Sequence, residues 1–409
     1  MSRNHIGVFP LLFMIILPIQ GCQKKEEAKP AVPAPAAPAP QAVPTPPPQP
    51  QPPAPAPQGA APAANIEQEY EKGAALALAG KLDEAGTLFE AAARLAPTDD
   101  DIAAAVALFR DLKDGRVSGE VVQQLFRSLQ LASDKKFEEA HAQVDQAIKL
   151  TPRYARAYDT RGKLYLMEGD YNRAIAPLSQ AVTLDPQFAA AFFNRGVVYS
   201  ELEQYDRAIA DYDRAIALKP TFAAAYRNRG SAHANSRNMD KAIADYTRAQ
   251  ELDPRDADTV FQRGVVHSLA GKWDAAIADF TKTIELDPSR GIAYYNRALM
   301  YQQKGDHERA IVEYTKSIEV NPSAPDPFIN RGLLYAQRRQ LERALADYDK
   351  ALALAPSLEF VHYNKALAYD NSGSAKEAIA EYRIFLERAK PAQAELIAKA
   401  RERVAALKR

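Results

Sequence analysis

The chain contains a single cysteine, Cys22, among 409 residues, and its basic and acidic side chains cancel, with 52 of each. A lone thiol cannot form an intramolecular disulfide, and with no second soft ligand near it in the sequence it makes a poor metal site. A zero net charge provides no long-range field that would draw the chain onto nucleic acid or acidic lipid. These absences exclude a disulfide-stapled fold and favour partners other than nucleic acids.

The sequence also lacks the patterns on which enzyme and cofactor sites are usually built. It shows no glycine-rich phosphate loop after a strand, and no serine or cysteine with an identifiable base partner. The six histidines form no short-spaced pair. His233 and His267 occupy equivalent places in neighbouring segments, and we interpret them as core substitutions rather than metal ligands. We therefore predict no catalytic residue, metal, cofactor or small-molecule substrate.

A period of 34 residues is present instead. Proline recurs at this interval from Pro152 to Pro356, and alanine keeps the same interval from Ala140 to Ala344. Within residues 189–222, small and apolar residues fall at three- and four-residue spacing in two runs, which is typical of two amphipathic helices. A fixed period of this length indicates a stack of helical hairpins, an architecture that holds a partner rather than transforming it.

The pattern resembles the tetratricopeptide repeat. With the small residue of each unit counted as position 8, the series reads Gly162, Gly196, Gly230, Gly264, Ala298, Gly332 and Ala366. Position 20 is alanine in the same units, from Ala174 to Ala378. The resemblance implies an all-α fold, a right-handed superhelical solenoid of stacked helix-turn-helix hairpins. We expect a divergent unit at 66–99, followed by eight units at 121–154, 155–188, 189–222, 223–256, 257–290, 291–324, 325–358 and 359–391.

Two segments fall outside the period. Residues 100–120 are an irregular insertion in which 101–113 can form a helix, and we expect the array to bend or break there. Residues 392–409 carry an apolar stripe opposite a charged face, and we expect them to form a helix that caps the last repeat.

The first 65 residues have a different character. Residues 1–21 read as a signal peptide, because their apolar run is short and contains Pro10 and Pro18. The sequence Ile19-Gln20-Gly21-Cys22 resembles a bacterial lipobox, which implies a lipid such as palmitate on Cys22 and a membrane anchor. By the same analogy Gln23 favours the periplasmic face of the outer membrane if the cell is Gram-negative. An uncleaved leader on a cytoplasmic or inner-membrane scaffold is the alternative.

Residues 22–65 are rich in proline and alanine. Such a segment favours extended polyproline II and cannot form a core. We interpret it as a disordered linker that lifts the repeats off the membrane; a docking strip for proline-recognising partners is the alternative.

Position 6 of the repeats carries a row of side-chain amides, which the resemblance places on the concave side of the solenoid. The row consists of Asn194, Asn228, Gln262, Asn296, Asn330 and Asn364, with Thr160 in the unit before them. It is similar to the asparagine ladder in the repeat domain of O-linked N-acetylglucosamine transferases, whose amides clamp an extended peptide. Position 5 adds Phe193, Phe261, Tyr295 and Tyr363, which we expect to form apolar pockets beside the amides. The alternative is that these asparagines bond only to neighbouring helices or water.

Position 7 is basic throughout, and position 23 is acidic in most of the same units. The basic residues are Arg161, Arg195, Arg229, Arg263, Arg297, Arg331 and Lys365; the acids are Asp211, Asp245, Asp279, Glu313, Asp347 and Glu381. We predict ion pairs between the two helices of a unit or between adjacent units. A row of arginines that binds phosphate or carboxylate is the alternative.

Together these features predict a non-enzymatic scaffold, a membrane-anchored lipoprotein that binds extended segments of cell-envelope proteins in a concave groove. Two other functions stay open at this point. One is a glycan- or peptidoglycan-binding module, and the other is an assembly factor for a pilus or secretion system.

Overall fold

The computed structural model describes residues 63–96 and 99–408 of the chain. In this part the chain forms 20 α-helices, one short 3₁₀ helix and no strand, so the predicted all-α class is confirmed. None of the described helices is long and apolar enough to cross a membrane. The predicted signal peptide and Cys22 lie outside the described residues, as does the predicted linker apart from residues 63–65, which belong to the first helix.

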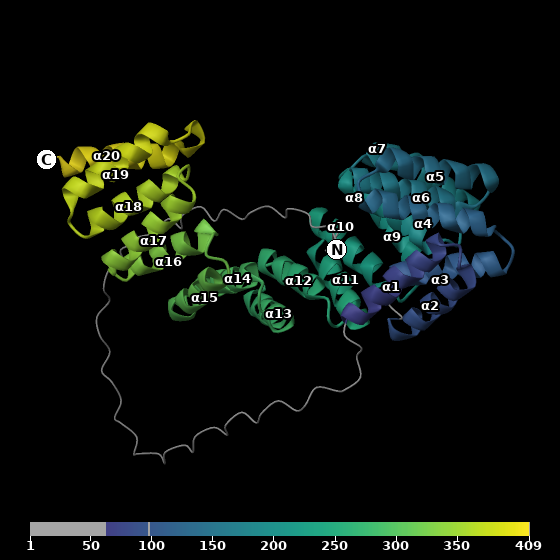
Figure 1. Cartoon of the computed structure of the whole chain (residues 1–409). Helices are drawn as coiled ribbons and strands as arrows, with labels where there is room; N and C mark the ends of the chain where they lie inside the picture. Colours follow the sequence, from purple (N-terminus) through teal and green to yellow (C-terminus); the bar gives the residue numbers. More distant parts are fainter. Residues whose placement is uncertain (1–62, 97–98, 409) are drawn as a thin grey trace, which may run out of the picture.

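Eighteen of the helices form nine antiparallel pairs that follow one another along a curved array (Figure 1). The pairs are α1 (Ala63–Leu78) with α2 (Leu82–Leu95), α4 (Gly119–Ser133) with α5 (Phe137–Leu150), α6 (Ala155–Glu168) with α7 (Tyr171–Leu184), α8 (Ala189–Glu201) with α9 (Tyr205–Leu218), α10 (Ala223–Asn235) with α11 (Met239–Leu252), α12 (Ala257–Leu269) with α13 (Trp273–Leu286), α14 (Gly291–Gln303) with α15 (His307–Val320), α16 (Pro325–Gln337) with α17 (Leu341–Leu354), and α18 (Glu359–Asn371) with α19 (Ala375–Arg388). The remaining helices are α3 (Asp100–Lys113), η1 (Pro391–Gln393) and α20 (Ala394–Leu407).

A small residue facing a large ring holds the two helices of a pair together. A Cβ atom on Gly196 of α8 would lie 2.7 Å from the ring of Tyr212 on α9. Tyr212 is 1% exposed, so the ring fills the space that the missing side chain leaves. Gly264 faces Phe280 and Gly332 faces Tyr348 in the same way. Most pairs are therefore closed by one aromatic side chain that inserts against the backbone of the first helix, and in the pair of α6 with α7 Leu178 takes this place against Gly162.

Stacking of successive pairs gives the array its curvature. First helices of neighbouring pairs contact one another, as α6 contacts α8 and α10 contacts α12. In the described array, second helices of neighbouring pairs make few or no such contacts. Because elements on the inside of a curve lie closer together than those on the outside, the first helices line the concave side. This arrangement buries the apolar faces that no single pair can bury alone.

The insertion at 100–120 does not break the array. Helix α3 lies between α2 and α4, and Phe109 on α3 contacts both Phe89 on α2 and Phe126 on α4, with ring centroids 5.5 Å and 5.8 Å apart. One continuous cluster of buried apolar residues runs across the insertion, from Ala77 to Leu164. Of the predicted bend or break, the break is wrong, because the inserted helix supplies an aromatic side chain that joins the cores on its two sides.

Helix α20 covers the last pair. Its Ala400 and Val404 are buried in one cluster with Tyr363, Tyr382 and Phe385. Its outer face carries charge, and the guanidinium of Arg403 donates two hydrogen bonds of 2.7 Å to Asp370 on α18. The predicted cap helix is thus present, and it shields an apolar face that would otherwise be exposed to water.

Candidate functional site

The predicted amide row lies on the first helices, along the concave side. Asn194, Asn228, Gln262, Asn296, Asn330 and Asn364 sit on α8, α10, α12, α14, α16 and α18 respectively. Asn194 is buried, and the others are half-buried. The six side chains therefore occupy equivalent places on six successive first helices, but their hydrogen bonds differ.

Two of the six amides are occupied by bonds within the array. The Nδ2 atom of Asn194 donates to Oδ1 of Asp159 at 2.7 Å, and Nδ2 of Asn330 donates to the hydroxyl of Tyr295 at 3.0 Å. In both cases the acceptor is the position-5 residue of the preceding unit, 35 residues earlier. At these two sites the alternative interpretation is correct, since the asparagine bonds to a neighbouring helix.

Three other asparagines meet no such acceptor. The position-5 residues that precede Asn228, Asn296 and Asn364 are apolar, namely Phe193, Phe261 and Ile329. None of these three amides forms a side-chain hydrogen bond with another residue in the described part of the chain. The position-5 residue of the unit before Gln262 is Arg227. The Oε1 atom of Gln262 is buried and has no hydrogen-bond partner among the described residues. The side-chain amides of Asn228, Asn296 and Asn364 are available to a ligand, whereas the Oε1 atom of Gln262 is covered by neighbouring protein atoms.

The position-5 rings mainly fill the interior of their own pairs. Phe193 contacts Tyr212 with ring centroids 5.9 Å apart, Phe261 contacts Phe280 at 5.7 Å and Tyr295 contacts Tyr314 at 5.8 Å. Tyr363 is buried against Tyr382 and Phe385. The sequence predicts separate apolar pockets here. In the structure the rings instead pack between the two helices of a pair, because each contacts the aromatic side chain at position 24.

The position-7 cations clamp adjacent pairs together. Arg195 donates from Nε and Nη2 to the carboxylate of Asp211 at 2.7 Å and 2.8 Å, which joins α8 to α9. Its Nη1 atom also donates to Ser179 on α7, the second helix of the preceding pair, at 3.3 Å. The same three-way arrangement recurs at Arg229 with Asp245 and Asp213, Arg263 with Asp279 and Thr247, Arg297 with Glu313 and Thr281, Arg331 with Asp347 and Thr315, and Lys365 with Glu381 and Asp349.

These clamps confirm the predicted ion pairs between the two helices of a unit. Ion pairs between units also form at Arg229 and Lys365, whereas serine or threonine hydroxyls are the partners in the preceding unit at the other clamps. The hydrogen bonds to Asp245 raise the pKa of Arg229 above its usual value. The first unit of the regular series lacks the position-23 acid because Pro177 stands there, and Arg161 pairs only with Asp145 of the preceding unit. With their donors occupied, the cations fix the register between pairs and are poorly placed to bind an anion.

The two equivalent histidines belong to this ion-pair row. Nδ1 of His267 lies 2.9 Å from Oδ2 of Asp279, and Nε2 of His233 lies 3.9 Å from Oδ2 of Asp245. Burial lowers the pKa of His233, which favours the neutral ring. Each histidine thus faces the acid of its own unit. In residues 63–96 and 99–408 no group of three His, Cys, Asp or Glu side chains is arranged to hold a metal ion.

Whether a position-6 amide is available depends on the position-5 residue of the preceding unit, which no single position reveals. This dependence becomes visible in the sequence when each position-6 amide is compared with the residue 35 places earlier. A polar residue there, such as Asp159 or Tyr295, accepts a bond from the amide, whereas an apolar residue leaves the amide available.

Family models match several parts of the array. A tetratricopeptide repeat model matches residues 189–222, 291–324 and 325–358, a second tetratricopeptide repeat model matches 230–300, and a TPR repeat model matches 162–203. No curated protein is significantly similar to the chain in sequence.

Solved structures of this repeat class are also similar. YrrB, described as a TPR protein with an unusual peptide-binding site, is 26% identical, with 44% of this chain and 92% of YrrB covered and a TM-score of 0.40. MamA from Desulfovibrio magneticus is 21% identical, with 41% and 96% covered and a TM-score of 0.40. The C-terminal part of a TPR protein from Cytophaga hutchinsonii is 22% identical, with 57% and 95% covered and a TM-score of 0.49. The family models thus find tetratricopeptide repeats within residues 162–222 and 230–358, and helix pairs of the same kind continue on both sides of these ranges.

Proposed function

We propose that the chain is a non-enzymatic adaptor that binds extended segments of other proteins along its concave side. Tetratricopeptide repeats serve as protein-interaction scaffolds, and curved repeat arrays present long inner surfaces suited to this task. The observation that carries the proposal is the set of amides on this surface that form no side-chain hydrogen bond within the described array, those of Asn228, Asn296 and Asn364. We call this set the amide row.

The chemistry of the amide row suits a peptide backbone. A carboxamide offers one acceptor oxygen and two donor hydrogens, which match the N–H and C=O groups of an extended chain. These groups are the same in every residue except proline, so the row binds without requiring a particular sequence. The half-buried setting strengthens such bonds, because water competes less for the same donors and acceptors.

We expect removal of the available amides to weaken peptide binding. In the triple variant Asn228→Ala, Asn296→Ala and Asn364→Ala, the affinity for peptides selected on the full chain from a displayed library of random dodecapeptides should fall about tenfold or more, since each lost bond contributes about 1 kcal/mol. Fluorescence anisotropy with the selected peptides measures the change.

The chain itself offers the matched control. Asn194→Ala with Asn330→Ala removes two amides whose Nδ2 donors already bond within the array, to Asp159 and Tyr295. This variant should lower the melting temperature, because it leaves buried acceptors unpaired, and should change peptide affinity little. An equal loss of affinity in the two variants would show that the amides act through stability rather than through contact with the peptide.

The proposal extends to a lipid anchor at Cys22 and to partners in the cell envelope. It is supported by the lipobox-like segment from Ile19 to Cys22 and by the proline-rich segment that follows it. We expect intact-mass measurement of the membrane-extracted protein to show an N-terminal Cys22 with a diacylglyceryl group, and Cys22→Ala to release the chain from the membrane fraction. A mass that retains Met1 without lipid would contradict the anchor while leaving the peptide-binding proposal intact.

A further inference from the structure

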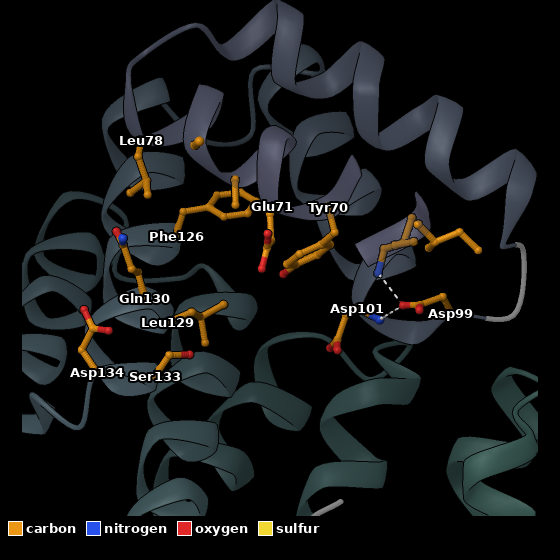
Figure 2. A pocket seen from close by; sticks show the side chains of 14 residues that line it. Tyr70, Glu71, Leu78, Asp99, Asp101, Phe126, Leu129, Gln130, Ser133 and Asp134 are labelled. Carbon is orange, nitrogen blue, oxygen red and sulfur yellow. Dashed lines mark hydrogen bonds between the residues drawn. The ribbon is translucent and has the colours of Figure 1, made fainter. Parts of the chain in front are cut away.

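A pocket lies at the N-terminal end of the concave side, between α1, α3 and α4 (Figure 2). Its volume is about 430 Å³, within the range of about 300–1,000 Å³ typical of ligand pockets. The apolar part of its wall includes Tyr70, Leu78, Ile102, Phe126 and Leu129. We call it the Glu71 pocket, after the carboxylate that lies between Phe126 and Tyr70 in this view.

The Glu71 pocket continues the surface that carries the amide row. Glu71 and Phe126 stand at position 6 of their units, the place that asparagine or glutamine holds farther along the array. A smaller cavity of about 80 Å³ shares Tyr70, Asp101, Phe126 and Leu129 with the pocket and extends to Thr160, the first position-6 residue of the regular units. Its two cations, Arg156 and Lys163, are paired with Asp111 and Asp159. A segment that lies along the amide row can therefore extend into the Glu71 pocket.

The inserted helix gives this pocket its charge. Helix α3 brings Asp99 and Asp101 to one side, and Asp134 lies at the other side beyond the end of α4, as Figure 2 shows. With Glu71, four acids line the pocket, and none of its lining residues is lysine, arginine or histidine. Burial, together with the charges of Asp101 and Asp99, raises the pKa of Tyr70 above its usual value.

The available carboxylates lie where a cation would be attracted most. Asp99 accepts hydrogen bonds from the N–H groups of Asp101 and Ile102, so the positive end of α3 offsets part of its charge. Glu71 and Asp134 form no ion pair with another described residue. The C-terminal ends of α1 and α4, marked by Leu78 and Ser133, line the same pocket and add partial negative charge.

We propose that the Glu71 pocket binds a lysine or arginine of the partner segment together with a neighbouring apolar side chain. Charge complementarity selects the cation, and the wall formed by Tyr70, Phe126 and Leu129 accommodates the apolar group. The inference goes beyond the proposed function, because the amide row contacts any backbone whereas this pocket distinguishes side chains. It would fix which stretch of a partner binds and at which end of the groove.

The test uses the same displayed library of random dodecapeptides on the full chain. Peptides that depend on the pocket should be rich in lysine or arginine beside an apolar residue. Their affinity should fall about tenfold in the variant Glu71→Gln, Asp101→Asn and Asp134→Asn, and should weaken with added salt. All three carboxylates are exposed, so their replacement should leave the melting temperature nearly unchanged.

A matched variant removes the same amount of charge elsewhere. Glu90→Gln, Glu138→Gln and Glu139→Gln neutralise three exposed acids on α2 and α5 that do not line the pocket. Affinity should change less than twofold in this control. An equal loss in both variants, or a selection without basic peptides, would overturn the inference. Peptides that lose binding only in the amide-row variant would overturn it as well, while leaving the proposed function in place.

Discussion

Replacement of Gly196 by leucine is expected to destabilise the array by about 3 kcal/mol, centred on α8 and α9. The added Cβ atom would lie 2.7 Å from the ring of Tyr212, and the rest of the leucine side chain has no space beyond it. Because each pair contacts only its neighbours, the damage should stay local. Denaturant titration measures the loss, and hydrogen exchange should show faster opening of α8 and α9 than of α16 and α17.

Gly196→Ala is the matched control for this prediction. Ala298 and Ala366 hold the same position in two other units, where Tyr314 and Tyr382 remain fully buried. A small shift of the ring therefore accommodates one methyl group, and alanine favours the helix over glycine by about 1 kcal/mol. The net change should be close to zero. A leucine variant as stable as the alanine variant would show that the two helices do not approach closely at this point.

Replacement of Arg331 by methionine is expected to cost about 3 kcal/mol, because it leaves a buried carboxylate without its partner. Asp347 is 5% exposed and receives hydrogen bonds of 2.9 Å and 2.7 Å from Nε and Nη2 of Arg331. The change also removes the bond from Nη1 to Thr315 on the preceding pair. Denaturant titration should show the lower stability, and hydrogen exchange should show weaker protection at the junction of α15 and α16.

A second substitution separates charge burial from simple loss of contact. In the double variant Arg331→Met with Asp347→Leu no buried charge remains, and most of the lost stability should return. The stacking register should then depend on the remaining apolar contacts. A double variant as unstable as the single one would show that the clamp stabilises the array through its hydrogen bonds to both pairs, and that charge burial contributes little.

Much of the fold follows from the period alone. Position 8 is glycine or alanine because position 24 places a large side chain against it, a ring in all regular units but the first, and both are visible in the sequence as residues 16 places apart, such as Gly196 and Tyr212. The charges at positions 7 and 23 likewise predict the pairs of Arg195 with Asp211 and its equivalents. The repeat period is sufficient to predict these contacts, because each of them recurs in successive units.

The amide row could be predicted only in part. Its position follows from the repeat, but which amides are available depends on the preceding unit, where Asp159 and Tyr295 are acceptors and Phe193 and Phe261 are not. The packing of the position-5 rings depends on contacts between helices that spacing does not show.

The Glu71 pocket and the continuous core at the insertion could not be predicted from the period. Both depend on α3, which has no counterpart in the other units. Phe109 joins two cores and Asp101 faces a pocket because of where α3 lies against α2 and α4. A repeat pattern carries no information about a helix that occurs once, so only the three-dimensional arrangement reveals this site.

The most direct test of the concave adaptor is site-specific photo-cross-linking in the native cell. A photoreactive amino acid is placed at Asn296 on α14, and in a separate variant at Val312 on α15, which is 57% exposed on the second helix of the same pair. We expect position 296 to cross-link to a continuous stretch of a partner protein and position 312 not to do so. Partner cross-links from position 312 with none from position 296 would contradict the concave adaptor.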